Sequence, residues 1–287
     1  LETKQNYIER LKKSIEKSKK ESRNGNYYNN KSNFLSYRKK IDLDIKRVIH
    51  NKGLKNEYNL KDIYGVVGEI NITGGSSYSF TIEDKLFDKI KSISNRLNTS
   101  VFITIISIYL VLFYKTTGFK NYRLAVVKSR RVYKEFERVL GWLSCDVIMC
   151  FELLESLSFT SLSRIVTDEL LSFPEKVFFN YEKIINELDC PLSVLSPYLF
   201  NYYQKKDRSI KNCIAAGHET NGFGQFDFYA IIEHYNDGLY FKINYNMEAY
   251  DKKQIQRIAN MFISLVNQIS DNDDLEIINY LLNTKDR

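Results

Sequence analysis

The stretch that most limits the fold of this chain is an uncharged run of 14 residues, VFITIISIYLVLFY, from Val101 to Tyr114. Thr99 or Ser100 supplies an N-cap before it and Gly118 supplies a stop after it, which predicts a helix that is apolar on every side. Such a helix must be enclosed by protein. Because a membrane span takes about 20 residues, we expect a central core helix and no membrane association.

Amphipathic helices are predicted on both sides of this core helix in the sequence. One follows a strand at Tyr78–Ile82 and is expected to be capped by Thr81 or Asp84, and another, near the C-terminal end, by Asp251. Spacings of three and four residues place apolar side chains on one face of each helix. The two stripes consist of Leu86, Ile90, Ile93 and Leu97 in the first helix, and of Ile255, Ile258, Phe262, Leu265 and Ile269 in the second.

The rest of the chain alternates runs of β-forming residues with further helical segments. Strands are expected at Arg123–Lys128, Asp146–Leu153, Tyr198–Tyr203, Ile210–Ala216, Gln225–Tyr235 and Leu239–Asn246. Additional helices are expected at residues 4–20, Ser161–Phe173 and Tyr181–Leu188. This pattern predicts an α/β fold with a mixed β-sheet flanked by helices.

Positive charge is concentrated in the first part of the chain. Residues 1–60 contain 16 Lys and Arg against 7 Asp and Glu, whereas the remaining residues carry 26 against 28. Such an imbalance can indicate nucleic-acid binding. Here the lysines alternate with Asn and Ser, and no glycine-rich or aromatic RNA-binding motif accompanies them. A solvated surface segment is the preferred interpretation, and nucleic-acid binding is an alternative that only residues 1–60 favour.

The sequence contains no complete catalytic motif. GxSxG, HExxH, Walker and GxGxxG patterns are all absent. The histidines are His50, His218 and His234. His234 stands three residues before Asp237, and the Asn-Asp-Gly that follows tolerates the positive φ of a tight hairpin. We therefore expect His234 to flank a turn near solvent rather than to act as a base, which leaves a Cys–His pair as the remaining nucleophilic alternative.

The cysteines indicate the setting of the protein. Cys145, Cys150, Cys190 and Cys213 are scattered and form no CxxC pair, so neither a disulfide framework nor a metal or redox site is expected. This favours a reducing, cytoplasmic setting, and no secretory signal opens the sequence. The first residue is Leu rather than Met, and we expect a trimmed or excised piece.

Several blocks of sequence occur in an order that is typical of one family. They are LETKQNYIERL at the start, residues 74–119, RLAVVKSRR, EFERVLGWLSCDVIMCFEL, FNYEKIINEL, the closing block of residues 222–269, and the tail LLNTKDR. Together they resemble the C-terminal lobe of nonribosomal peptide synthetase condensation domains. The resemblance implies a chloramphenicol-acetyltransferase-like lobe at residues 74–287, preceded at residues 1–73 by a helix and a basic Lys- and Asn-rich segment. Residues 19–73 have no recognised family counterpart.

The resemblance implies an acyltransferase role in secondary metabolite biosynthesis. Complete condensation domains form an amide bond between acyl or peptidyl and aminoacyl thioesters. Donor and acceptor peptidyl carrier proteins bring these thioesters on phosphopantetheine arms, so the implied partners are the carriers, an N-terminal lobe and a neighbouring adenylation domain. No cofactor is expected to bind the chain directly.

The catalytic HHxxxDG motif of the family belongs to the other lobe and is absent from this sequence. His234 lies one residue too close to Asp237 to replace it, so no catalytic residue is carried over. We expect the isolated chain to be inactive, and the alternative is a non-catalytic carrier-binding or scaffold module.

The resemblance also implies residues at the substrate tunnel and the lobe interface. Gly141 matches a glycine that permits close approach beside the tunnel. Trp142 stands at an aromatic position, for which core packing is the alternative, and Cys145 replaces the usual Asn and loses its hydrogen bonding. A surface ion pair is the alternative for the loop arginine. The full implied set is Arg130, Arg131, Gly141, Trp142, Cys145, Phe226 and Asp227.

Overall fold

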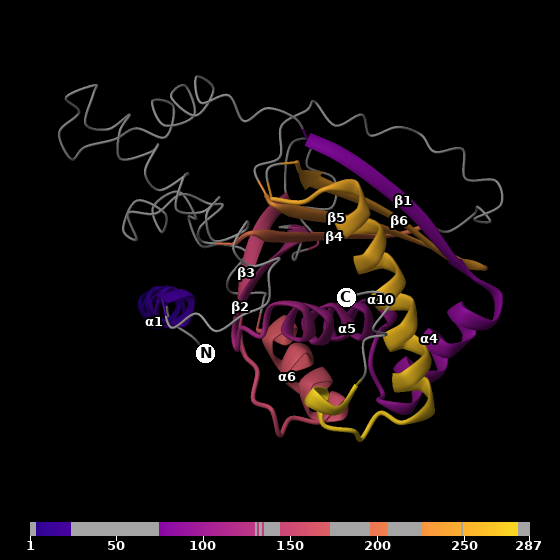
Figure 1. Cartoon of the computed structure of the whole chain (residues 1–287), viewed down its shortest axis with the longest axis horizontal. Helices are drawn as coiled ribbons and strands as arrows, with labels where there is room; N and C mark the ends of the chain where they lie inside the picture. Colours follow the sequence, from indigo (N-terminus) through magenta and orange to yellow (C-terminus); the bar gives the residue numbers. More distant parts are fainter. Residues whose placement is uncertain are drawn as a thin grey trace.

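The computed structural model describes residues 4–23, 75–129, 131, 134, 144–172, 196–205, 226–247 and 249–280. In this part of the chain four helices cover one face of a six-stranded sheet, and a fifth helix lies against the opposite face (Figure 1). The strand predicted at Ile210–Ala216 and the helix predicted at Tyr181–Leu188 lie outside the described residues, as do Arg130, Gly141 and Trp142.

The sheet is mixed, as predicted. Its strands are β1 (Gly75–Glu83), β2 (Asn121–Ser129), β3 (Ser144–Glu152), β4 (Tyr198–Gln204), β5 (Phe228–Tyr235) and β6 (Gly238–Asn246). They lie in the order β1-β6-β5-β4-β2-β3. The pairs β2–β4 and β4–β5 are parallel, and the remaining pairs are antiparallel. The carboxyl ends of β2, β4 and β5 therefore meet at one edge of the sheet.

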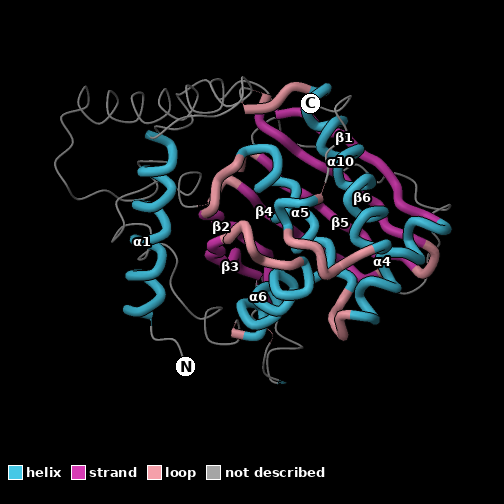
Figure 2. The backbone as a smooth tube through the Cα atoms, turned by 60° about the horizontal axis from the view of Figure 1, so that its bottom comes forward, coloured by secondary structure: helices cyan, strands magenta, loops and turns pink. Residues whose placement is uncertain are grey.

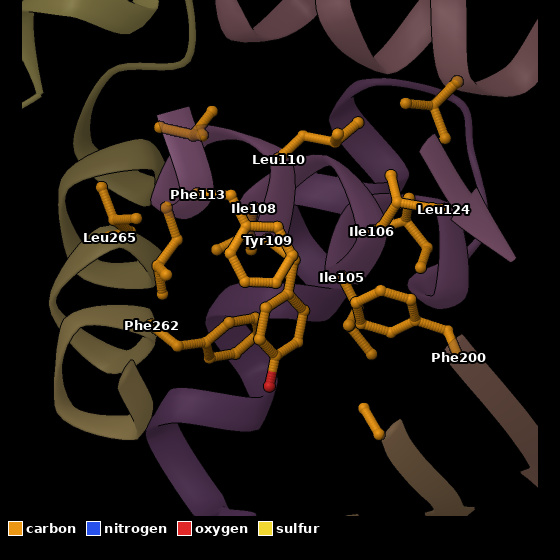
Figure 3. Close-up of a cluster of buried hydrophobic side chains, with 14 of the residues drawn as sticks. Ile105, Ile106, Ile108, Tyr109, Leu110, Phe113, Leu124, Phe200, Phe262 and Leu265 are labelled. Atoms are coloured by element: carbon orange, nitrogen blue, oxygen red, sulfur yellow. The ribbon is translucent and has the colours of Figure 1, made fainter. Parts of the chain in front are cut away.

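The uncharged run forms helix α5 (Val101–Thr117) at the centre of the helical layer, as predicted. The Ser100 side chain accepts a hydrogen bond from the Ile103 amide at 3.2 Å, and Gly118 ends the helix with a φ of 65°. Every residue from 104 to 114 is buried. Figure 3 shows Tyr109 of α5 among buried apolar side chains, and its ring lies 4.8 Å from that of Phe262 between centroids.

The other helices of this layer are α4 (Asp84–Arg96), α6 (Phe159–Leu171) and α10 (Lys252–Asp271), and a short 3-10 helix, η3 (Ile277–Asn279), follows. Asp251 caps α10 as predicted, because its side chain accepts from the Gln254 amide at 2.7 Å and a reciprocal bond completes a capping box. In the described part of the chain no single helix is long and apolar enough to cross a membrane. Among the described helices, α4 and α5 taken together have the required length and composition, but they are bent by 100° relative to each other.

Two of the predicted helix starts differ from the structure. Strand β1 continues to Glu83 and α4 begins immediately at Asp84, whose φ is 50°. No side chain caps α4, and the Thr81 hydroxyl donates instead to the Glu83 carboxylate at 3.1 Å, so the predicted Thr81 or Asp84 cap is wrong. Helix α6 starts two residues before the predicted Ser161, since Ser158 supplies its cap.

The β5–β6 hairpin is present where the Asn-Asp-Gly sequence predicts it, with Tyr235 opposite Gly238. Its turn residues have ordinary negative φ, because positive φ occurs among the described residues only at Asp84, Asn98 and Gly118. The expectation that this turn uses positive φ is therefore wrong. Strand β5 begins at Phe228, three residues later than predicted.

Side chains alternate between the two faces of the sheet, as the pleat requires. We call the face under α4, α5, α6 and α10 the inner face; on β5 it carries Phe228, Ala230 and Ile232, all fully buried. The opposite, outer face carries Tyr229, Ile231 and Glu233 of the same strand. The two faces thus have different compositions on one strand.

Helix α1 (Lys4–Arg23) packs on the outer face over β2 and β3 and stands apart from the other helices in Figure 2. Its buried side chains are Tyr7, Ile8, Leu11, Ser14 and Ile15, which lie on one face of the helix. The Tyr7 hydroxyl donates to the Ile148 carbonyl at 2.6 Å, and Arg10 forms an ion pair with Glu169 of α6 at 2.9 Å. These contacts attach the N-terminal helix to the lobe.

Candidate functional site

The predicted tunnel residues inside the described part of the chain lie at two different ends of the sheet. Cys145 follows Ser144 at the start of β3, opposite Lys128 near the carboxyl end of β2, and Arg131 follows that end of β2. Phe226 and Asp227 precede β5 at the opposite end. The strand register separates the levels of Cys145 and Asp227 by about 16 Å along the strands. The structure therefore does not gather these four residues into one site.

Phe226 belongs to the packing between α1 and the sheet, and Asp227 is buried next to it in the sequence. They are 6% and 3% exposed, and Phe226 packs in the same apolar cluster as Leu11 of α1. The Asp227 carbonyl accepts from the Asn246 amide at 3.1 Å, which holds the start of β5 against the end of β6. Arg131 is exposed, and its amide donates to the Ser129 hydroxyl at 3.1 Å.

A second group of residues combines polar and aromatic side chains at the carboxyl ends of the parallel strands. We call it the sheet-end cluster, and it consists of Lys128 of β2, Tyr202 of β4, His234 of β5, Phe87 and Lys91 of α4, and Phe102 of α5. The rings of Phe102 and Tyr202 lie 4.9 Å apart, and the Lys128 ammonium lies 5.9 Å from the Phe102 ring. Cys145 is the cross-strand neighbour of Lys128.

His234 flanks the turn, as predicted, but it is half-buried rather than near solvent. Its Nδ1 and the Tyr202 hydroxyl form a hydrogen bond of 2.5 Å, and the Phe87 ring meets the imidazole edge-on at 5.5 Å. The expectation of a solvent-side histidine was wrong because His234 occupies an inner-face position, where the strand alternation turns its side chain toward α4.

Burial sets the protonation states in the sheet-end cluster. It lowers the pKa of His234, with a smaller contribution from the Lys91 charge, and it raises the pKa of Tyr202. At neutral pH the phenol is therefore protonated and the imidazole is neutral, so Tyr202 can donate to Nδ1. Burial also lowers the pKa of Lys128. The cluster thus offers hydrogen-bonding groups set between aromatic rings.

The chemistry of this cluster suits binding better than nucleophilic catalysis. The hydrogen-bond partner of His234 is a phenol, whereas a triad orients its histidine with a carboxylate. Among the described residues, no group of three or more His, Cys, Asp or Glu side chains could hold a metal ion. Ligands of open α/β sheets bind beyond the carboxyl ends of the strands, where this cluster lies.

Sequence reasoning missed the sheet-end cluster, although one signal could have indicated it. Lys128, Tyr202 and His234 all fall on the inner-face alternation of their strands, near the carboxyl ends. A polar group at a core-facing position needs a partner. Their meeting depends on the parallel registers β2–β4 and β4–β5, which no local pattern specifies.

Comparison with known proteins connects this fold to one family. The family model described as "Condensation domain" matches residues 71–286. A linear gramicidin synthase of Brevibacillus parabrevis is 23% identical over 207 residues, which cover 69% of this chain and 4% of that protein. Bacitracin synthase 1 of Bacillus licheniformis is 19% identical over 212 residues, which cover 71% of this chain and 4% of that protein.

Solved structures show the same fold at lower sequence identity. The first condensation domain of the calcium-dependent antibiotic synthetase, in complex with a substrate analogue, aligns with a TM-score of 0.61 and 12% identity over 74% of this chain and 47% of that one. The X-domain from teicoplanin biosynthesis aligns with a TM-score of 0.62 and 10% identity over 72% and 50%. These likenesses confirm the predicted fold class, a mixed sheet flanked by helices in a chloramphenicol-acetyltransferase-like lobe. The chain spans half or less of these solved chains and a few per cent of the curated relatives.

Proposed function

Because the chain belongs to the condensation domain family by the match over residues 71–286, we propose that it is the C-terminal lobe of a nonribosomal peptide synthetase condensation domain. The observation that carries this proposal is the fraction of each solved condensation-type chain that this chain covers. A single sheet with its helices aligns with 47% to 50% of solved family members, which is the share expected of one lobe in a two-lobed domain. The curated relatives that the chain matches are peptide synthetases, which supports the same assignment.

In the complete domain two carrier proteins bring their thioesters into a tunnel between the lobes. The acceptor amine attacks the donor thioester carbon; the C–N bond forms, the C–S bond breaks, and the donor thiol leaves with the proton that the amine loses. The lobe that carries HHxxxDG assists this proton transfer. This chain supplies the acceptor-side wall, where the sheet-end cluster positions the arriving group and excludes water. On its own the chain forms no amide bond.

The two-part division of the chain belongs to the same proposal. Residues 74–287 form the lobe, and residues 1–73 lead into it from the preceding lobe through α1 and the basic segment. The docking of α1 on the outer face, with Leu11 fully buried, supports such a junction. The residues assigned to the tunnel and the lobe interface are Arg130, Arg131, Gly141, Trp142, Cys145, Phe226 and Asp227.

The proposed partners are the N-terminal lobe, donor and acceptor carrier proteins with phosphopantetheine arms, and a neighbouring adenylation domain. The proposed location is the cytoplasm. The cysteines are scattered and form no CxxC pair in the sequence, which supports a reducing compartment.

Reconstitution tests the proposal. The chain is purified alone and together with an N-terminal lobe that carries HHxxxDG, and each sample receives loaded donor and acceptor carriers. Mass spectrometry of the acceptor arm should detect amide product only when both lobes are present. Product from the chain alone would contradict the proposed division of labour, and a stable two-lobe complex that forms no product would reject the catalytic assignment.

A second candidate is a non-catalytic module that binds carriers. Cys145 favours it, because this residue occupies the usual Asn position and lies beside Lys128 in the sheet-end cluster. Under this alternative the two-lobe sample binds both carriers and remains inactive. If the Cys145→Asn variant forms product, the inactivity of the two-lobe sample is due to the cysteine at this position.

A further inference from the structure

Four polar side chains on the outer face are not used by the proposed reaction. They lie on three neighbouring strands, and we call them the outer polar set: Asn201 and Tyr203 of β4, Tyr229 of β5 and Asn244 of β6. Asn201 is opposite Ile231 of β5, and Tyr229 is opposite Asn244. The set therefore forms one patch beside the area that α1 covers.

Asn201 organises the two phenols of this set. Its Nδ2 donates to the Tyr203 hydroxyl oxygen at 2.7 Å and to the Tyr229 hydroxyl oxygen at 3.2 Å. Asn201 is only 7% exposed, so its orientation is fixed by these bonds. Each phenol oxygen thus accepts from Asn201 and keeps its own O–H for another acceptor.

Burial keeps the Tyr229 hydroxyl protonated, so that it can donate a hydrogen bond. It raises the pKa of Tyr229, and the effect exceeds the opposing hydrogen bond from Asn201, while nearby Tyr203 and Asp146 raise it further. Tyr229 is therefore protonated throughout the neutral range. Tyr203 is 41% exposed, so the patch reaches the surface.

Asn244 supplies an acceptor on β6, the strand on the other side of β5 from Asn201. Its Oδ1 is buried and has no hydrogen-bond partner among the described residues. A buried acceptor without a donor is costly, and native proteins retain few of them. Directly opposite residues on antiparallel strands have Cβ atoms about 5 Å apart, so the Tyr229 and Asn244 side chains lie next to each other.

We propose that the outer polar set binds a secondary amide of an extended chain. The Tyr229 hydroxyl donates to the amide oxygen, and the Asn244 Oδ1 accepts from the amide N–H. Ile231, which is 6% exposed and lies on the same face, contacts the adjoining methylene or side-chain carbons. A pantetheine arm and a peptidyl chain both carry such amides; naming these two as ligands rests on the function proposed above, and the binding experiment distinguishes between them.

Binding to the full 287-residue chain tests this inference. The side-chain amides of Asn201 and Asn244 are followed by NMR during titration with D-pantetheine, with N-acetyl-Ala-Ala-N-methylamide, or with triethylene glycol, which has similar length and no amide. We expect both side chains to shift with at least one amide probe and not with the glycol. A shift with pantetheine alone identifies the arm as the source, and a shift with the peptide alone identifies the peptidyl chain.

Substitutions separate binding from folding. Asn244→Leu removes the acceptor and Tyr229→Phe removes the donor, and each should weaken binding of the amide probe about tenfold. Tyr240→Phe is the matched control, because Tyr240 is on the outer face of the same strand but donates to the Ser79 hydroxyl at 3.0 Å. It should leave the affinity unchanged.

Equal shifts with the glycol, or unchanged affinity in both the Asn244→Leu and Tyr229→Phe variants, would overturn the inference. If the two-lobe enzyme then still makes amide product, the function proposed above stands and only this site fails.

Discussion

The two faces of the sheet are built from alternate residues of the same strands, yet they differ in almost every physical respect. On β4 the inner-face Phe200 is fully buried beneath Tyr109 of α5, with the ring centroids 5.1 Å apart, while its neighbour Asn201 orients two phenols on the outer face. The inner face gains stability from apolar burial. The outer face carries an apolar cluster beneath α1 and mostly polar side chains beyond it, with Ile231 as a buried apolar exception. This division indicates that the inner face holds the lobe together, whereas the recognition sites proposed above lie on the outer face and at the strand ends.

The largest expected effect tests whether the inner face carries the stability. Phe241→Ala should lower the free energy of unfolding by about 3–5 kcal/mol, because a fully buried ring that stacks on Phe80 at 4.7 Å would be lost. Tyr240→Ala, one residue away on the outer face, should cost only about 1 kcal/mol. Urea unfolding of both variants makes the measurement. An equal decrease in the free energy of unfolding for both variants would show that the two faces contribute equally to stability.

A smaller effect tests the apolar part of the outer face. Leu11→Ala should weaken the docking of α1 by about 2 kcal/mol, since Leu11 is fully buried against the sheet. Hydrogen exchange should accelerate in α1 while the amides of β5 keep their protection. Glu16→Ala, on the exposed side of the same helix, is the control. Parallel loss of protection in β5 would mean that α1 belongs to the cooperative core.

The smallest effect concerns His234, a polar side chain on the inner face at the carboxyl end of β5. Because burial lowers the pKa of His234 in the folded chain, the unfolded chain binds a proton more readily at that site as the pH falls through about 6.5. The folded state should therefore lose stability below this pH, and His234→Gln should reduce the loss slightly. Thermal unfolding of the unsubstituted chain and of the variant at pH 7.5 and 5.5 measures this loss of stability. His50 and His218 are present in both proteins, so their effect on stability cancels in the comparison. An identical pH dependence would place the imidazole in contact with water.

Local patterns predicted the elements of this fold better than its sites. The uncharged run, the Asn-Asp-Gly hairpin and the Asp251 cap each depend on residues close in sequence, and the structure contains all three. The start of α4 was missed because β1 pairs with β6 through Glu83, which holds Thr81 in a strand. Pairing over a distance of 155 residues has no local signature.

The candidate sites depend even more on distant contacts. Cys145 and Asp227 were assigned to one region from the resemblance, but the register places them about 16 Å apart along the strands. The Tyr202–His234 bond and the outer polar set each require two or more strands to come together. Alternation could have shown which face each residue occupies, but not which residues become neighbours.

The pairing of β1 with β6 has a consequence for the order in which the lobe can be completed. Gly75 at the start of one strand faces Asn246 at the end of the other, and all nine residues of β1 are matched in this way. On a ribosome β1 leaves the exit tunnel long before β6, its neighbour in the described part of the sheet, has been synthesised. The uncharged α5, made soon after β1, must also wait for α10 to cover it. Nascent chains of this lobe are therefore expected to depend on chaperones until residues beyond 271 have emerged.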